Sequence, residues 1–95
     1  MGGETMNIRR VLLDVDKAIQ RPEIIEVAEA IDSAPGVTGV NITVTEIDVQ
    51  TVVMDITVEG DNIDIGALFR AIESTGAVVH SIDEMAAGER LVELG

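Results

Sequence analysis

The feature that most constrains the fold of this chain is a strand–helix–strand pattern that occurs twice in succession, over residues 8–48 and 51–86. In each half, the outer segments alternate between apolar and polar residues, and the segment between them has the apolar spacing of a helix. The order β-α-β-β-α-β is typical of the ferredoxin-like α+β fold. Right-handed crossovers place the first strand beside the third, which predicts a four-stranded antiparallel sheet of order 4-1-3-2 with both helices on one face.

Turn and cap residues mark the boundaries of these elements. Pro22 is expected in the first turn of the first helix, where its missing N–H has no cost, and Pro35 with Gly36 ends that helix. Asp64 is a good N-cap for the second helix, and Gly76 occupies the position just after its end. The four strands are expected over residues 8–16, 37–48, 52–59 and 77–86.

The chain has 95 residues, which is the size of one domain. We therefore expect a single ferredoxin-like domain over 1–95, in which residues 1–7 and 90–95 form flexible tails or dock onto another subunit. A domain this small buries only about 60–65% of its unfolded surface, so a partner subunit would add stability. Phe69, the only aromatic residue, is expected in the core between the second helix and the sheet.

The charge balance excludes several classes of partner. Six basic residues stand against 18 acidic ones, for a net charge of -12. Nucleic-acid binding needs Lys and Arg to neutralise phosphates, and anionic membranes attract basic surfaces, so neither partner is expected. The absence of cysteine excludes disulfides and thiolate metal sites. No signal peptide or apolar run of about 20 residues is visible, so a cytoplasmic location is expected.

Carboxylates are expected to gather on the face of the sheet that the helices leave open. If Val11, Leu13 and Val15 face the helices, Asp14 and Asp16 point the other way. Corresponding alternation places Asp55 on the third strand and, with Ile82 in the core, Ser81 and Asp83 on the fourth. Hard cations such as Ca²⁺ and Mg²⁺ bind several oxygen ligands of this kind. The alternative is a solvated acidic face, or acids that pair with Arg9 and Arg10 of a neighbouring subunit.

Two further groups of residues have weaker indications of chemistry. Glu46 and Asp48 lie near the hairpin turn, where they form a second cation site, an intersubunit contact or simply a polar strand end. Simple alternation places them on the side of Val44, and a bulge would reverse that placement. His80, the only histidine, falls on the helix-facing side with Ile82, where a structural role is the favoured interpretation over a metal ligand or general base.

Several ordered motifs resemble the archaeal domain of unknown function 211 family. They are Gly36-Val37-Thr38-Gly39-Val40-Asn41-Ile42-Thr43, Glu46-Ile47-Asp48, His80-Ser81-Ile82-Asp83-Glu84 and Ala87-Gly88, within a similarity that runs from about Val11 to Arg90. The resemblance implies a small ferredoxin-like protein that forms ring-like homo-oligomers with bound divalent cations. The acidic positions that match the family pattern are Asp14, Glu46, Asp48, Asp83 and Glu84. The family has no established activity that the resemblance could carry over to this chain.

These observations favour a non-enzymatic homo-oligomer that binds divalent cations, with Ca²⁺ or Mg²⁺ as the expected ion. Apolar residues expected on the open face, Leu12, Val53, Ile47 and Val79, indicate a surface for a partner. One alternative is a regulatory module that binds a small ligand between subunits, as ACT-type domains do. Another is a metal-dependent hydrolase, for which no paired acid and base can be named.

Overall fold

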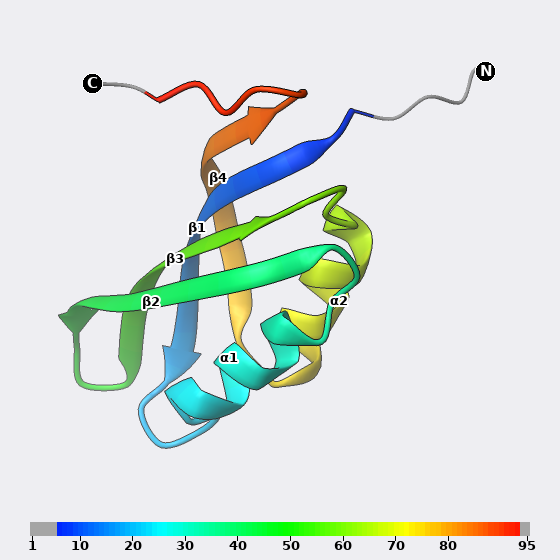
Figure 1. Cartoon of the computed structure of the whole chain (residues 1–95). Coiled ribbons are helices and arrows are strands. Elements are labelled where there is room, and N and C mark those ends of the chain that lie inside the picture. Colours follow the sequence, from blue (N-terminus) through cyan, green and yellow to red (C-terminus); the bar gives the residue numbers. More distant parts are fainter. Residues whose placement is uncertain (1–5, 94–95) are drawn as a thin grey trace.

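The computed structural model describes residues 6–93, which form one sheet and two helices (Figure 1). The order of elements is strand, helix, strand, strand, helix, strand, as the sequence predicts. The elements are β1 (Ile8–Ala18), α1 (Ile24–Asp32), β2 (Val37–Ile47), β3 (Thr51–Gly60), α2 (Ile65–Ser74) and β4 (Val78–Ala87).

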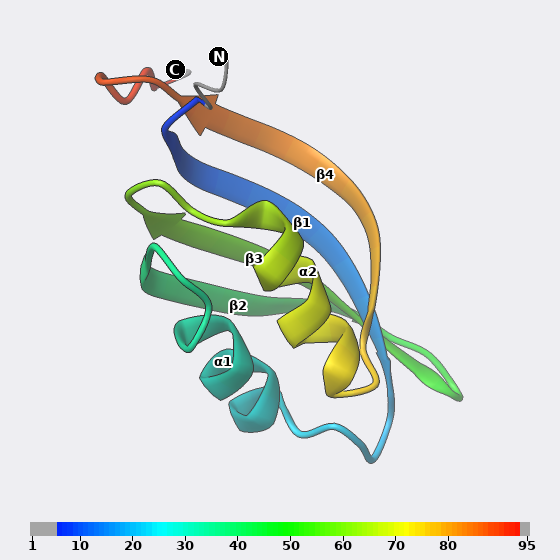
Figure 2. The same cartoon turned by 90° about the vertical axis from the view of Figure 1, so that its right-hand side faces the viewer.

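The four strands form a single sheet in the order β2-β3-β1-β4, and each neighbouring pair is antiparallel. Both helices lie on one face of this sheet, α1 toward β2 and α2 toward β1 and β4 (Figure 2). The predicted ferredoxin-like fold, with its 4-1-3-2 order, is therefore confirmed. Within residues 6–93, no helix covers the opposite face of the sheet, here called the open face.

Strict alternation along the two central strands creates the core. The alternating residues of β1 and β3 that face the helices are buried, while those between them stay partly accessible. Burial of a Val, Leu or Ile side chain contributes about 1.5–3 kcal/mol, so these two rows are a major source of stability. The fully buried members of the two rows are Val11, Leu13 and Val15, and Met54, Ile56 and Val58.

The predicted cap of α2 is confirmed, but the predicted start of α1 is wrong. The Asp64 side chain accepts a hydrogen bond from the N–H of Ala67 at 3.0 Å, and Gly76 has a positive φ of 102° just beyond the helix. In α1, however, Pro22 precedes the helix and follows a cis peptide bond. Glu23 is the N-cap and forms a capping box with Glu26, in which the backbone N–H of Glu23 donates a hydrogen bond to Oε1 of Glu26 at 2.7 Å.

Two residues expected in the core are less buried than predicted. Phe69 is only half-buried and packs against the edge of the core, whereas its neighbours Leu68 and Ile72 are fully buried. Ile82 is 45% exposed. Its strand β4 is an edge strand, and α2 does not cover the whole of it (Figure 2).

Candidate functional site

One row of oxygen-bearing side chains crosses the middle of the open face, from β2 to β4. Asp14 on β1 lies directly opposite Asp55 on β3. Thr43 on β2 lies opposite Asp55, and Ser81 on β4 lies opposite Asp14. Because paired residues of antiparallel strands point to the same side, the two carboxylates are flanked on both sides by hydroxyl groups. We call this set, Thr43, Asp55, Asp14 and Ser81, the central row.

One atom of the central row lacks a protein partner. Oδ1 of Asp14 is buried and accepts no hydrogen bond from the described part of the chain. A buried carboxylate oxygen without a donor is costly, since it has lost its water and gained nothing in exchange. Such an atom is expected to be satisfied by a cation, a water molecule or a group from another subunit.

Asp83 joins the central row indirectly, through Ser81. The ladder between β1 and β4 shifts register between Leu12 and Leu13, where Asp83 is left without a partner. The Ser81 hydroxyl donates a hydrogen bond to Oδ1 of Asp83 at 2.7 Å. A bulge of this kind re-aims side chains, and here Asp83 adds a third carboxylate at the β4 end of the row.

His80 is not on the helix-facing side, so that prediction is wrong. A second register shift, between Asp14 and Val15, leaves His80 unpaired in the ladder. Its Nε2 atom lies 2.8 Å from Oδ2 of Asp16, and the His80 side chain is 53% exposed. The bulge brings the imidazole to the Asp16 side of the sheet, where the pair lies one step along the strands from the central row.

Glu46 and Asp48 do not form a joint site. The ladder between β2 and β3 skips Thr45, which reverses the simple alternation and places Glu46 opposite Val53. Glu46 therefore shares the open face with Asp16, with β3 between them. Asp48 lies beyond the end of β2, where its Oδ1 accepts a hydrogen bond from the N–H of Val49 at 2.7 Å. Its carboxylate thus belongs to the hairpin turn.

The apolar residues expected on the open face divide into two pairs. Leu12 and Val53 are there, half-buried among the acids. Ile47 and Val79 are on the other side, because they pair with the buried residues Val52 and Val15. The same two bulges that move Glu46 and His80 account for this difference, since each shifts the alternation by one residue.

The carboxylates of one chain do not by themselves make a metal cage. Within residues 6–93, no group of three or more His, Cys, Asp or Glu side chains lies close enough together to hold a metal ion. The central row has two carboxylates and two hydroxyl groups in direct register, and Asp83 beyond them. A cation bound there would therefore need water molecules or a second copy of the chain to complete its shell.

A cluster around Arg10 was not predicted. Its guanidinium contacts Glu59 at 2.9 Å, Glu93 at 2.7 Å and Glu84 at 3.6 Å, and the Arg10 side chain is 14% exposed. Hydrogen bonds to Glu93 and Glu59 raise the pKa of Arg10, and the hydrogen bonds from Arg10 lower the pKa of Glu93. The signal available in the sequence was the alternation along the first and third strands, which places Arg10 and Glu59 on one face; the register then sets them opposite each other. The contact with Glu93 anchors the chain beyond β4.

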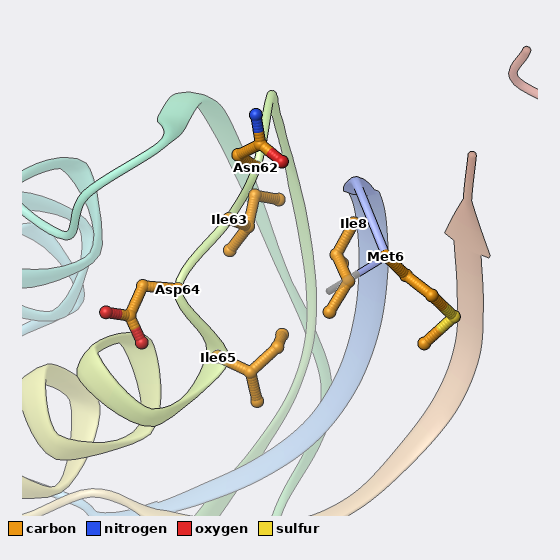
Figure 3. A pocket seen from close by; sticks show the side chains of 6 residues that line it. All are labelled: Met6, Ile8, Asn62, Ile63, Asp64 and Ile65. Atoms are coloured by element: carbon orange, nitrogen blue, oxygen red, sulfur yellow. The ribbon is translucent and has the colours of Figure 1, made fainter. Parts of the chain in front are cut away.

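An apolar hollow lies away from the acidic residues of the open face, between the start of β1 and the start of α2 (Figure 3). Its lining side chains are Met6, Ile8, Asn62, Ile63, Asp64 and Ile65. The carboxylate of Asp64 is already used as the cap of α2. The hollow thus brings together no set of titratable groups suited to catalysis. No helix among residues 6–93 has the length and apolarity needed to cross a membrane.

Comparison with known proteins gives two similarities. The profile of DUF211, a family described as uncharacterized ArCR, matches residues 9–95. The uncharacterized protein MJ0319 of Methanocaldococcus jannaschii is 43% identical over 86 residues, which cover 90% of this chain and 88% of that protein. The region matched by the family profile includes both helices and all four strands, apart from Ile8, the first residue of β1.

Proposed function

The chain belongs to the DUF211 family, whose description assigns no activity, and from the chemistry of its open face we propose that it is a non-enzymatic homo-oligomer that binds divalent cations. The observation that carries this proposal is the direct opposition of Asp14 and Asp55 on the two central strands. Like charges placed opposite each other destabilise a sheet by up to about 1 kcal/mol. A cation between them replaces that repulsion with attraction.

The ligand types of the central row suit a hard cation. Ca²⁺ takes about six to eight oxygen ligands from carboxylates, hydroxyls, carbonyls and water, and Mg²⁺ takes six. The unpartnered Oδ1 of Asp14 is already stripped of water and lies at the centre of the row. Asp55 adds the second carboxylate, and the hydroxyls of Thr43 and Ser81 lie on either side.

Oligomer formation is the second half of the proposal, and it also rests on the open face. Leu12 and Val53 are apolar residues on a sheet surface that no helix covers. Apolar surface of this kind is typical of protein–protein contacts. A second subunit would cover it and would supply further oxygen ligands to the ion. We propose a closed, ring-like assembly, which is one way in which repeated contacts between identical subunits are satisfied.

Native mass spectrometry tests both halves at once. The protein is purified with a chelator, transferred to ammonium acetate, and measured before and after addition of micromolar Ca²⁺ or Mg²⁺. The proposal predicts a mass that is a multiple of 10.1 kDa and an increment of bound ion. The double variant Asp14→Asn, Asp55→Asn should lose the ion, and Asp32→Asn, on the exposed end of α1, should keep it. A chelator-treated protein that takes up no ion would refute cation binding.

The alternative function is a regulatory module that holds a small ligand between subunits. Its support is the shared ferredoxin-like fold, which many unrelated functions use. The same spectra separate the two proposals. A bound organic molecule of a few hundred daltons, retained through purification and indifferent to chelator, would favour the regulatory module.

A further inference from the structure

The edge strand β2 has a property that is unusual for a chain of this charge. It forms one border of the sheet, so one side of its backbone has no neighbouring strand in the described part of the chain. From Ser33 to Thr45 the sequence has no charged residue, although the chain has a net charge of -12. Edge strands are normally protected from pairing by charges, prolines or bulges. Between Gly39 and Val44, where the register with β3 is regular, β2 has none of these.

The side chains of β2 that face the helices are also incompletely buried. Val40 and Ile42 are only half-buried, and Val44 is 37% exposed. Their partners on β3 are fully buried, because β3 has a strand on each side. A further strand beside β2 would give its apolar row the same environment.

The opposite edge of the sheet is protected. β4 contains His80, Asp83 and Glu84 within its length, and its ladder with β1 has three register shifts. Charges and bulges of this kind discourage a new strand from pairing. The β2–β3 ladder also shifts register, but only near the ends of β2, at Thr38 and Thr45. The two edges of the sheet therefore differ, because only β2 has an uncharged and regular middle segment, from Gly39 to Val44.

We propose that β2 pairs in antiparallel fashion with β2 of a second copy of this chain, so that two four-stranded sheets form one continuous sheet. This inference rests on the homo-oligomeric part of the proposed function and adds a two-fold interface to it, distinct from the repeated head-to-tail contact that closes a ring. The occupant is a second copy because the strand is complementary to itself. A contact between two acidic surfaces needs a bound cation to offset repulsion, whereas this edge lies in the longest uncharged stretch of the chain and needs none.

The uncharged part of the strand also defines the register. The uncharged run from Val37 to Thr45 is centred on Asn41. Pairing about Asn41 therefore matches the regular segment from Gly39 to Thr43 with its own copy, and the bulges at Thr38 and Thr45 lie outside this segment. Val40 then lies opposite the partner's Ile42, and both are on the helix-facing side. The two Asn41 amides meet on the open face, where each has donors and acceptors for the other. Glu46, the first charged residue, lies beyond the paired segment.

The neighbouring helix extends the uncharged surface. α1 packs on the sheet next to β2 and lies at the same border of the molecule (Figure 2). Its first turn exposes Ile25 at 68%. Two-fold pairing about Asn41 brings the α1 helices of both copies to the same face of the joined sheet. The interface is isologous, which means that the same patch is used by both subunits.

Cysteine cross-linking tests the register directly, because the chain has no cysteine of its own. Paired residues of antiparallel strands have Cα atoms about 4.5–5.5 Å apart, within the range that a disulfide spans. Asn41→Cys should form a disulfide-linked dimer under mild oxidation. Thr43→Cys, whose copies would lie about 13 Å apart in this register, and Gln50→Cys in the hairpin turn should not. Equal cross-linking of all three, or none at Asn41→Cys, overturns the proposal.

Charge substitution at the same position tests the interface without oxidation. Asn41→Asp keeps the acceptor for the Thr43 hydroxyl but places two carboxylates together, so light scattering should show loss of this contact. Asn41→Lys should also abolish the β2–β2 contact, because it places two positive charges together. An equal mixture of the Asp and Lys variants should restore the contact, because the charges are then opposite. Gln50→Glu is the control of equal charge. A wild-type oligomer unaffected by Asn41→Asp overturns this interface while the proposed oligomer stands. A monomeric wild type overturns both this interface and the proposed homo-oligomer. Cation binding is tested independently of either, by the uptake of ions in native mass spectrometry.

Discussion

Asp14 of β1 and Asp55 of β3 are cross-strand partners at the centre of the open face, with no basic residue in their row. The two central strands could have placed an Arg or Lys opposite either aspartate, as β1 does further along, where Arg10 lies opposite Glu59. A like-charge pair in the middle of a sheet lowers stability unless something else compensates. This pair therefore has the most direct consequences for how the protein responds to ions.

Divalent cations should raise the melting temperature more than NaCl of the same ionic strength. General screening acts in both samples, so only site binding separates them. An ion at 100 times its dissociation constant adds about 2.7 kcal/mol to the free energy of unfolding. For a domain of this size that corresponds to a shift of roughly 10–20 °C. Differential scanning calorimetry with Ca²⁺ or Mg²⁺ measures it.

Single substitutions assign that stabilisation to particular residues. Asp14→Asn, Asp55→Asn and Asp83→Asn should each reduce the difference between the divalent and NaCl melts, since each removes a charged oxygen. Glu23 is unsuitable as a control, because it caps α1. Glu29→Gln, on the exposed side of the same helix, should leave the difference unchanged. Identical melts of the wild type in the two salts would leave the open face as a solvated acidic surface.

Alanine should be tolerated at Gly39 but not at Gly36 or Gly60. A Cβ at Gly36, where φ is +89°, would lie 2.5 Å from the carbonyl oxygen of Asn62. A Cβ at Gly60 would overlap the carbonyl oxygen of Gly36. Such contacts with backbone force strain of about 1–3 kcal/mol or more. At Gly39 no atom lies within 4 Å of an added Cβ, so urea denaturation should change by less than about 0.5 kcal/mol.

Leu68→Ala should destabilise the fold more than Phe69→Ala. Leu68 is fully buried between α2 and the sheet, and truncation there leaves a cavity that costs about 2–5 kcal/mol. Phe69 is larger, but it is half-buried at the edge of the core, so water fills part of the space that its ring vacates. Chemical denaturation of both variants measures the difference. A larger loss for Phe69→Ala would place its ring inside the core.

Acid should release the residues that follow β4. Arg10 lowers the pKa of Glu93 by hydrogen bonding to its charged form, so the contact is fully present above the ordinary carboxyl pKa. It is lost as the pH falls through the lowered value in the folded state. NMR relaxation of the Glu93 amide should report increased motion at that pH. Glu93→Gln should show the motion at neutral pH, and Glu89→Gln should not. If the mobility of the Glu93 amide were the same at all pH values, the contact between Arg10 and Glu93 would be contradicted.

Much of the fold is predictable from local patterns. The alternation of Val11, Leu13 and Val15 defines a buried strand face, and the cap at Asp64 defines where α2 begins. These features depend on neighbours in sequence, and the handedness of crossovers then leaves few arrangements of the strands. The same alternation places Asp14 and Asp55 on one face once β1 lies beside β3, whereas their direct opposition depends on the register of the two strands.

The bulges are what the pattern of residues did not determine. One register shift passes over Thr45 and turns Glu46 to the open face, and another moves His80 beside Asp16. A shift by one residue reverses every later side chain, so simple alternation failed beyond each of these points. A bulge inserts one extra residue into one strand relative to its neighbour. Its position therefore depends on how two strands pair, and the alternation within a single strand does not reveal it.

The sequence by itself determined the order of elements, the buried rows and the acid excess, because each of these is a property of local spacing or composition. Tertiary structure alone decided which charges meet. Arg10 contacts Glu93 across 83 positions in the sequence, and Ser81 comes to lie opposite Asp14 only because β4 returns beside β1. Contacts of this range depend on strand pairing and on the bulges within it, so they exist only once the whole sheet has formed.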